Sequence, residues 1–581
     1  MSNVICPNCR AAVPTFEACI HCHIPLSALT GPAAGAEPGG APAAVKLSPS
    51  PGPADGLPLG LDPHLKEVRF RVIDEGVSKL ATSSTGRDEV AVIGKVTDVA
   101  ALKAVASVRV GLEIAPTTQD DHTTIVTARM PVGKIKEIRS LPFVKSLKLA
   151  LRLMPALDKT VKEIQAGPDL PPLVAIKPPQ VQVDKASGKG VVVGIVDFGL
   201  DFVHRNFRDQ NGKTRVLAIW DQTSPAKDGP LGYGKVHYRE DIDTALGAAD
   251  PYTALGYGPD LDSASGEIGA HGTHVTDIAA GNGLGSSLPG VAPEADIVFV
   301  EASTKAFPNF SPDAVGDSFG DTAQLLEAIS FIFNFAKDRP CVVNISLGAN
   351  GGPHDGTTLV EEGINRLMAQ SPNRAVIIAA GNSFTADIHA SGTVPAGGST
   401  DILWSVPSLD SSNNQLETWY SGEDELALQI IRPDGTTQAT VGLGSELTFR
   451  GDGNQRDGAM IVANRRKDPN NGENVIAVFV GRTVTPGTWT LRLLGERVKD
   501  GHFHAWIERD SDNESRFLPA AGASTDNSCT LSSISCGHRT IVVGSYDAHD
   551  AALPISPSSS SGPTRDRRRK PEISAPGHAV L

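Results

Sequence analysis

Four segments of the sequence are predominantly apolar, without a regular alternation of polar residues, and are separated by stretches with other patterns. They span residues 191–196, 295–301, 341–345 and 375–380. Strands that are covered by helices on both faces read in this way, because neither face meets water. Segments 321–337 and 357–370, which lie between them, are long enough for helices and show helical periodicity. The central part of the chain is therefore predicted to be an α/β domain with a parallel sheet.

Polar residues with catalytic potential stand at the ends of these segments. Asp197 directly follows the apolar run 191–196, and functional groups of parallel α/β folds lie at such carboxyl ends. His271 opens the small-residue segment His271-Gly272-Thr273-His274-Val275, in which Gly272 permits close backbone packing beside an imidazole. His274 is expected to pack against the fold rather than to take part in chemistry.

Two further segments offer groups that a peptide substrate needs. Asn382 ends the run Ala379-Ala380-Gly381-Asn382, and an amide there can donate to a carbonyl oxygen that becomes negative during acyl transfer. Residues 343–348 form a strand edge against which an extended peptide can add as a further strand. Ser346, Leu347 and Gly348 are the residues expected to line the substrate there.

In this order the four blocks resemble the subtilisin-like serine protease family, peptidase S8, whose blocks read D-[ST]-G, H-G-T-H-V, N-x-S-L-G and A-A-G-N. Residues 560–564 and 570–577 resemble the family's approach to its serine. The resemblance covers roughly 185–382 and 525–581. It implies that Asp197 orients His271, that His271 is the general base and acid, and that Asn382 holds the oxyanion. The implied function is a serine endopeptidase that hydrolyses peptide bonds of protein or peptide substrates.

The sequence departs from the family pattern in two places. Phe198 stands where the family has Ser or Thr, and we expect this change to be tolerated because the position is not a triad member. The G-T-S-x-A-x-P block, which carries the nucleophile in the family, does not occur before Leu581. The lookalike 522–525 precedes the Ala-Pro-Gly block and is rejected. The serine is expected beyond Leu581, and the chain alone is expected to be inactive and poorly stable.

Two other functions remain open at this point. The missing nucleophile block is compatible with a pseudoprotease that serves as a protein-binding module. The domain is also compatible with a docking platform for an N-terminal zinc-binding segment that does the main work.

That N-terminal segment, residues 1–26, is predicted to be a zinc ribbon. Two CxxC turns aim four thiolates at one point, and with no open position the site is structural. Metal binding would supply the folding energy of a segment that has almost no core. His21 or His23 replacing a cysteine, and four unliganded thiols, are the alternatives. The four candidate zinc ligands are Cys6, Cys9, Cys19 and Cys22.

Cysteine usage and the N-terminus also bear on localisation and partners. Only Cys341, Cys529 and Cys536 follow the ribbon, which does not resemble the even framework of a disulfide-rich secreted domain. No basic region followed by an apolar stretch marks a secretory signal. The sequence therefore predicts a cytoplasmic protein in a reducing compartment, with a possible protein partner for the ribbon.

The rest of the chain divides into linkers and two more domains. Residues 27–64 are rich in Pro, Ala and Gly and read as a disordered linker. Residues 65–160 have a β-α-β-β-α-β order, which predicts a ferredoxin-like α+β domain. Its position before the catalytic domain resembles that of a propeptide, so we expect it to cover the substrate cleft until the chain is cut near 160–185. An unrelated α+β docking domain is the alternative.

A Pro-punctuated linker, 161–184, leads into the catalytic domain, which is predicted to span 185–389 and 519–581. The intervening residues 390–518 show short alternating strands with turn signals and little helical periodicity, which predicts an inserted antiparallel β-sandwich. Trp489 and Trp506 are expected in its core.

Charge and hydropathy exclude two classes of partner. The formal net charge of −14 argues against binding of nucleic acid across the surface. No apolar run approaches the roughly 20 residues of a membrane-spanning helix, so no membrane contact is expected. The basic run Arg565 to Lys570 is interpreted as a solvated loop. Calcium ions are common in the family, but no calcium ligands are identifiable from the sequence.

Overall fold

We describe a computed structural model of the chain, in which the contacts divide into two units, residues 1–47 and 48–581. In the first unit β1 (Asn3–Ile5) pairs antiparallel with β2 (Ala12–Pro14). The four cysteines proposed as zinc ligands lie outside the described residues. The structure describes residues 3–5, 12–14, 62–63, 65, 89–118, 120–150, 154–155, 187–259, 271–302, 322–408, 414–449, 460–480, 485–508 and 515–578.

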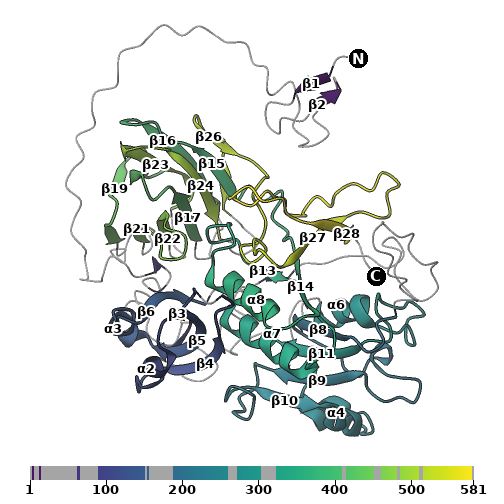
Figure 1. Cartoon of the computed structure of the whole chain (residues 1–581). Helices are drawn as coiled ribbons and strands as arrows, with labels where there is room; N and C mark the ends of the chain where they lie inside the picture. Colours follow the sequence, from purple (N-terminus) through teal and green to yellow (C-terminus); the bar gives the residue numbers. More distant parts are fainter. Residues whose placement is uncertain are drawn as a thin grey trace. The chain divides into compact units, whose positions relative to one another are not determined.

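The second unit is built on an eight-stranded sheet with the order β10-β9-β11-β8-β12-β14-β27-β28 (Figure 1). All neighbouring strands in it are parallel except β10, which pairs antiparallel with β9. A parallel sheet at the centre of the chain is what the unbroken apolar runs predict. The strands are β8 (Val192–Asp197), β9 (Val216–Asp221), β10 (Lys235–Tyr238), β11 (Asp296–Glu301), β12 (Cys341–Ile345), β14 (Arg374–Ala379), β27 (Ile541–Tyr546) and β28 (Ile573–Pro576).

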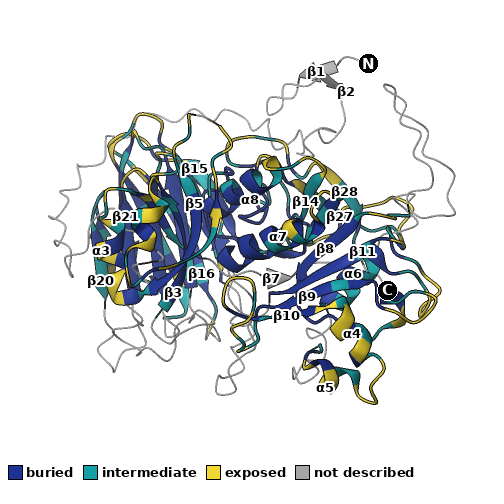
Figure 2. Ribbon diagram, turned by 60° about the horizontal axis from the view of Figure 1, so that its bottom comes forward, coloured by how far each residue is buried: buried dark blue, intermediate teal, exposed yellow. Residues whose placement is uncertain are grey.

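Helices cover both faces of this sheet. In β8, Val192 and Val196 share a core with α7 (Thr322–Ala336) and α8 (Leu359–Ala369). Val193 and Ile195, which point the other way, share a core with Val275 of α6 (His271–Ala280). Figure 2 shows the resulting contrast between the buried strands β8, β9 and β11 and the exposed surface helices α4 (Arg239–Ala245) and α5 (Pro251–Leu255).

Local signals fix where several of these helices begin and end. Thr358 caps α8: its hydroxyl accepts a hydrogen bond from the backbone N–H of Glu361 at 3.3 Å. Asp250 caps α5, which has Pro251 at its first turn and ends at Gly256 in the left-handed region, with φ 70°. Both devices satisfy backbone groups that a helix end leaves without partners.

Residues 89–149 form a four-stranded antiparallel sheet with the order β4-β5-β3-β6. In β3, Val90 and Val92 pack on this segment's own helices, while Ala91 and Ile93 belong to the core that contains α7 and α8. The sheet is therefore buried on both faces. The elements are β3 (Glu89–Val96), α2 (Val99–Lys103), β4 (Arg109–Ile114), β5 (Thr124–Pro131), the 3-10 turn η3 (Val132–Lys134), α3 (Ile135–Arg139) and β6 (Val144–Leu149).

The chain between β14 and β27 forms two antiparallel sheets with one shared core, in which Trp404 and Trp489 are buried. The seven-stranded sheet includes β26, so it extends past the predicted boundary at residue 518 because β26 pairs with β15. That sheet, in order, is β20 (Glu446–Phe449), β21 (Met460–Arg465), β22 (Asn474–Val480), β17 (Asn414–Tyr420), β24 (His502–Ile507), β15 (His389–Thr393) and β26 (Ala523–Thr525). The five-stranded sheet is β19 (Thr437–Val441), β18 (Glu425–Ile431), β23 (Gly487–Arg497), β16 (Ser399–Val406) and β25 (Arg516–Leu518).

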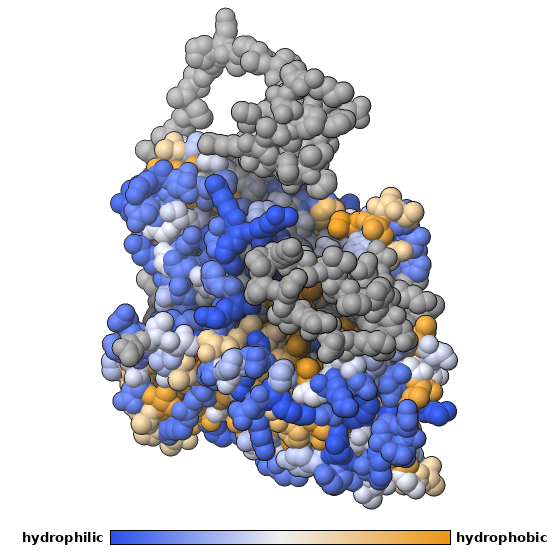
Figure 3. Space-filling model, turned by 45° about the vertical axis from the view of Figure 1, so that its right-hand side comes forward, coloured by the Kyte–Doolittle hydropathy of each residue, from blue (hydrophilic) through white to orange (hydrophobic). Residues whose placement is uncertain are grey.

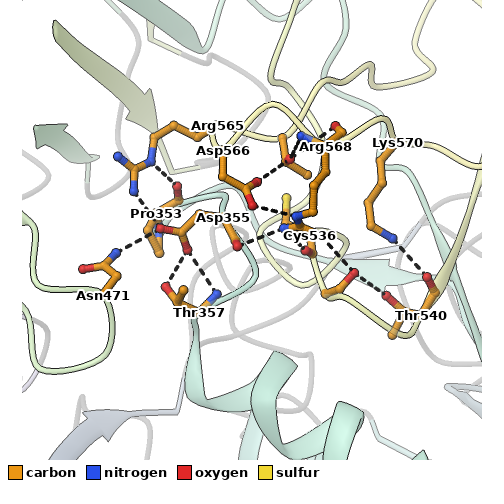
Figure 4. Close-up of polar contacts among 12 residues, drawn as sticks. Pro353, Asp355, Thr357, Asn471, Cys536, Thr540, Arg565, Asp566, Arg568 and Lys570 are labelled. Carbon is orange, nitrogen blue, oxygen red and sulfur yellow. Dashed lines mark hydrogen bonds and ion pairs between the residues drawn. The ribbon is translucent and has the colours of Figure 1, made fainter.

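The interpretation of Arg565 to Lys570 as a solvated loop is wrong for both of its ends. The Arg565 side chain is 10% exposed and pairs with Asp355 at 2.7 Å (Figure 4). It also contacts Glu473, which directly precedes β22. Lys570 is buried and donates to the carbonyl oxygen of Thr540 at 3.0 Å (Figure 4). Buried cations need such partners, so this basic segment ties the chain near its described end to both the inserted sheets and the α/β domain.

On the surface, hydrophobic and hydrophilic residues are interspersed over the face shown in Figure 3. Exposed large hydrophobic side chains include Ile541 of β27 and Ile573 of β28, with Ile555 between these strands in the sequence. Among the helices of the described residues, none is both long and apolar enough to cross a membrane.

Candidate active site

Asp197 and His271, predicted from separate segments, meet at the carboxyl end of β8. The carboxylate oxygen Oδ1 of Asp197 lies 2.6 Å from Nδ1 of His271. Asp197 is fully buried, whereas the His271 side chain keeps 17% of its exposure. Within the described residues, the other ring nitrogen, Nε2, has no hydrogen-bond partner. One imidazole nitrogen is thus held by a carboxylate, and the opposite one is buried with its hydrogen-bonding capacity unused within the described residues.

The peptide that follows Asp197 fixes this pair. The backbone N–H of Phe198 donates to Asp197 Oδ1 at 2.8 Å, and its ring stacks on the His271 imidazole with centroids 5.1 Å apart. The N–H of Gly272 donates to the carbonyl oxygen of Phe198 at 2.6 Å. A Cβ at Gly272 would lie 2.6 Å from that oxygen and 2.7 Å from the ring of Phe299, so a larger residue does not fit there. Phe198 therefore takes a direct part in holding the histidine.

A second carboxyl group, that of Glu301, holds the loop that follows Asp197. Glu301, at the end of the neighbouring strand β11, accepts hydrogen bonds from the N–H of Gly199 at 2.8 Å and from the Tyr257 hydroxyl at 2.9 Å. Burial, and then the nearby Asp221 charge, raise the pKa of Glu301 to about 8. A neutral carboxyl avoids a second negative charge beside Asp197.

The pKa of His271 reflects two opposed influences. Burial lowers it, because the charged imidazolium loses water. The charge and hydrogen bond of Asp197 raise it, and together they outweigh burial, so that the pKa of His271 lies above its ordinary value of 6.5. The pair is electrostatically suited to stabilise an imidazolium once the ring accepts a proton.

The remaining predicted residues follow neighbouring strands of the same sheet. β12 lies between β8 and β14, so Ser346 and Asn382 are on the same sheet edge as Asp197. Asn382 is exposed, as a group that meets a substrate has to be. Ser346 is buried and accepts a hydrogen bond from the Asn344 side chain at 3.0 Å. Its side chain therefore faces the fold, and only its backbone is suited to contact a substrate.

Leu347 and Gly348 form the short strand β13 (Leu347–Gly348), which pairs antiparallel with β7 (Met154–Pro155). This strand edge therefore accepts an extended segment of the chain, as the sequence predicts for a peptide. A Cβ at Gly348 would lie 2.4 Å from the Ser532 hydroxyl, so the strand rests closely on the segment around Ser532.

The sheet of residues 89–149 contacts the catalytic domain through buried charges. Arg129 of β5 forms a two-pronged ion pair with Glu327 of α7, with Nη2 and Oε2 2.9 Å apart. The side chains of Thr127 and Tyr233 also donate to Glu327. Nearby, Lys95 pairs with Glu362 of α8 at 2.9 Å. Arg129 and Glu327 are buried as a pair, and Lys95 and Glu362 form a second, partly exposed pair.

Sequence reasoning missed three parts of the site. Glu301 and Tyr257 gave no local signal, because their contacts depend on strand order. The stacking role of Phe198 is visible only once the histidine is placed beside it. The pairing of residue 154 with Gly348 depends on a segment that carries no motif of its own.

Comparisons with known proteins agree with this geometry. Residues 188–455 match the family described as Peptidase_S8, Subtilase family. The chain is 31% identical over 211 residues to the PII-type proteinase of Lacticaseibacillus paracasei, covering 35% of this chain and 10% of that protein. It is 31% identical over 216 residues to the extracellular protease of Xanthomonas campestris pv. campestris, covering 37% of this chain and 32% of that protein.

A solved structure extends the similarity to most of the fold. The CspB protease of Clostridium perfringens matches with a TM-score of 0.55 and 25% identity, over 68% of this chain and 76% of that chain. The matches to the two curated proteases span only 10% and 32% of their lengths. The family match, these relatives and the shared fold show that this chain carries a subtilase domain of the subtilisin-like serine protease family.

Proposed function

We propose that this chain is part of a serine endopeptidase that hydrolyses peptide bonds by an Asp-His-Ser mechanism. The observation that carries the proposal is the buried contact between Asp197 and His271, with Nε2 of the histidine left without a partner among the described residues. We assign the nucleophile to a serine beyond Leu581, since the family's G-T-S-x-A-x-P block does not occur in residues 1–581.

In this mechanism Asp197 accepts a hydrogen bond from the Nδ1–H of His271, which leaves the Nε2 lone pair free to take the serine proton. The serine oxygen then attacks the peptide carbonyl, and the side-chain amide of Asn382 donates to the oxyanion that forms. His271 returns the proton to the leaving amine. An activated water repeats the sequence on the acyl-enzyme and releases the acid product.

The test is fluorophosphonate labelling of the protein expressed from the full reading frame. Labelling is expected in the unsubstituted protein and not in His271→Ala. His274→Ala is the matched control, because His274 lies on the same helix and is half-buried. Absence of labelling in a folded protein that contains the downstream G-T-S sequence would refute the assignment.

The second candidate function is a pseudoprotease that binds proteins. The antiparallel pairing of β7 with β13 favours it, because a strand edge that holds an extended segment can bind a peptide without cutting it. A reading frame that closes directly after Leu581, with a folded monodisperse product that binds peptides and is not labelled, would support this function over the first.

We further propose that the propeptide-like domain, residues 65–160, inhibits the enzyme until the chain is cut between 160 and 185. Two contacts support this: β7 pairs with the substrate strand β13, and Arg129 pairs with Glu327 beneath the domain. Removing Arg129 leaves the Glu327 carboxylate buried without its cation, which costs about 3–5 kcal/mol. Arg129→Ala is therefore expected to free the domain and speed its proteolysis.

Arg109→Ala is the matched control for this experiment, since Arg109 forms an exposed ion pair with Glu89 within the same sheet. Surface pairs contribute little, so its rate of proteolysis is expected to stay near that of the unsubstituted protein. Full activity of the uncut protein on a peptide substrate would contradict the inhibitory role.

The N-terminal cysteines suit a structural zinc ion. Four thiolates, Cys6, Cys9, Cys19 and Cys22, are a complete tetrahedral donor set. The strands β1 and β2 bracket the first CxxC pair, as a ribbon hairpin requires. We propose that this ribbon recruits a protein partner and that the enzyme works in the cytoplasm, where free thiols persist. Loss of a chelator-sensitive zinc ion in Cys6→Ser would support the ribbon.

A further inference from the structure

A cluster of metal-binding side chains lies where the inserted sheets rejoin the α/β domain. His389 of β15, His504 of β24 and Cys529 each offer one ligand atom, and these atoms all lie within 4.8 Å of one another. His389 is fully buried and Cys529 is 5% exposed. None of these residues belongs to the catalytic site described above or to the N-terminal ribbon.

From this geometry we propose that His389 Nε2, His504 Nδ1 and Cys529 Sγ bind one transition-metal ion of the zinc class. The two nitrogens are 3.0 Å apart. In a tetrahedral zinc site with bonds of about 2.0–2.1 Å, two nitrogen ligands are about 3.3 Å apart. The histidines are therefore already close to the required spacing. Imidazole and thiolate ligands favour zinc, whereas calcium and magnesium favour oxygen ligands.

Asp526 completes the arrangement as an orienting group. Its Oδ1 lies 3.1 Å from His389 Nδ1, on the opposite side of the ring from the cluster. A carboxylate at that position holds the Nδ1 proton and directs the Nε2 lone pair at the metal, as in carboxylate–histidine–zinc sites. The Ser528 backbone N–H, at 2.9 Å, and its hydroxyl, at 2.5 Å, fix the same carboxylate oxygen.

Cys529 is held in an unusual conformation that aims it at the histidines. Its φ is 53°, in the left-handed region that a residue with a side chain seldom adopts. The Trp506 indole donates to the Cys529 carbonyl oxygen at 2.8 Å, and its ring stacks on His504. Strained backbone of this kind persists where the surroundings enforce it, often at binding sites.

Proton balance sets the pH dependence of binding. A cysteine binds a metal ion as its thiolate, so the Cys529 thiol has to lose its proton on binding. Binding forms the metal–sulfur bond and breaks the S–H bond, so one proton leaves to solvent and affinity rises with pH.

The titratable and charged groups that face the cluster come from several elements. The ring of His502 of β24 lies edge-on to that of His504, with centroids 5.3 Å apart, and Asp526 lies beside His389. Arg565 of the basic segment is also close to His504, and the ring of His354, from the loop after β13, stacks on Trp506. A bound dication is therefore compensated by the Cys529 thiolate and the Asp526 carboxylate.

The site would brace the substrate strand. Three residues after Cys529, Ser532 accepts a hydrogen bond from the Ala349 N–H at 3.0 Å and donates to the Ala349 carbonyl oxygen at 3.1 Å. Its own N–H donates to the Ala380 carbonyl oxygen at 2.8 Å, just before Asn382. A metal at Cys529 thus fixes the segment that contacts both the β13 region and the end of β14.

The test uses the full-length protein with Ser at the four ribbon cysteines, so that the ribbon cannot bind metal. After chelation, titration with Co²⁺ alone is expected to give one equivalent per chain, tetrahedral d–d bands and a thiolate charge-transfer band. Zinc should displace the Co²⁺. Absence of Co²⁺ uptake by this protein, shown to be folded by circular dichroism, would overturn the proposal without any substitution at the site.

Variants then assign the ligands. Cys529→Ser should abolish the charge-transfer band, and His504→Gln should weaken Co²⁺ binding more than about 100-fold, beyond the loss expected for an outer-shell partner. His549→Gln is the control, because His549 is exposed and follows β27, outside the cluster. The Co²⁺ affinity of this variant should stay within about threefold of the parent, whereas loss of an outer-shell contact costs at least about tenfold. A charge-transfer band that survives in folded Cys529→Ser would show that another group binds the ion, and the proposed ligand set would be wrong.

Discussion

The molecule contains two histidines whose Nδ1 atoms face a carboxylate, and they differ in what lies beyond the ring. His271 contacts Asp197 at 2.6 Å, and its Nε2 has no partner among the described residues. His389 contacts Asp526 at 3.1 Å, and its Nε2 lies 3.0 Å from a second imidazole. A carboxylate at Nδ1 of a histidine can thus direct the Nε2 lone pair either to a proton or to a metal ion.

The difference teaches that the carboxylate alone does not define the function of such a pair. At His271 the ring stacks on Phe198 and the side chain keeps 17% of its exposure, which suits a base that must reach a substrate. At His389 the side chain is fully buried beside a thiol and another imidazole, which suits a closed coordination site. Substitutions in the two pairs, and of the carboxyl group beside the first pair, can therefore separate the two functions.

The largest effect is expected from His271→Ala in the protein with its full reading frame. Loss of the general base should lower kcat by about six orders of magnitude, as removal of this residue does in a serine protease triad. Hydrolysis of a chromogenic peptide measures the rate, and the metal content measured on the same sample should not change. Residual activity above about 1% of the unsubstituted rate would exclude His271 as the base.

Asp197→Asn is expected to lower kcat by about 10⁴, because an amide stabilises the wrong imidazole tautomer and cannot stabilise the imidazolium. The same peptide assay measures it. The comparison with Asp526→Asn is direct, since that substitution changes a carboxylate to an amide beside the other histidine and should leave kcat within a fewfold of the parent.

Asp526→Asn is expected to weaken Co²⁺ binding about 10–100-fold in the ribbon-free protein, the usual cost of losing an orienting carboxylate. Equilibrium titration measures the change in Kd. Unchanged affinity would mean that Asp526 does not orient His389 in the bound state. The two histidine–carboxylate pairs would then share a hydrogen bond but not an orienting role of the carboxylate.

The pH profile of kcat/KM should report on the first pair. His271 must be neutral to accept a proton, and Asp197 holds its pKa above 6.5. Activity is therefore expected to fall about tenfold per pH unit at pH values below this raised pKa. Asp197→Asn should move the acid limb to lower pH. An acid limb that does not move would show that another group controls it.

The smallest effect concerns Glu301, the neutral carboxyl beside the first pair. Its pKa in the folded protein is about 8, against 4.5 for the unperturbed group. Between these pH values the unfolded chain has lost the proton that the folded chain keeps, so stability falls as pH rises from about 4.5 to about 8. The substitution Glu301→Gln removes this ionisable group. The urea midpoint of unfolding should therefore vary less with pH in the variant than in the unsubstituted protein. Glu240→Gln, at an exposed site on α4, is the control.

Much of this architecture was predictable because buried strands and helices have characteristic patterns of apolar residues in the sequence. The continuous apolar runs predicted the parallel strands, and residues at their ends predicted which side chains share an edge. Asp197 and His271 were identified because each stands in a motif whose neighbours serve the same geometry, such as Gly272 beside Phe198.

What the sequence did not reveal depends on contacts between distant segments. His389, His504 and Cys529 come from two strands and a loop, with no spacing that links them. Arg565 and Lys570 look like a solvated basic run, since nothing local shows that Asp355 and Glu473 will neutralise Arg565. Charge pairing across the fold is a property of the assembled sheets, and periodicity does not report it.

The pairing of β15 with β26 has a consequence for the order of folding. It brings together the two ends of the inserted sheets, so that His389 and Asp526 touch across 137 residues of sequence. Ser535 must still reach Ala379 across 156 residues. If the insertion folds first, that closure shortens to roughly 20 residues, which lowers its entropic cost by about 2 kcal/mol. The inserted sheets then act as a short linker, and nucleation within them would precede completion of the parallel sheet.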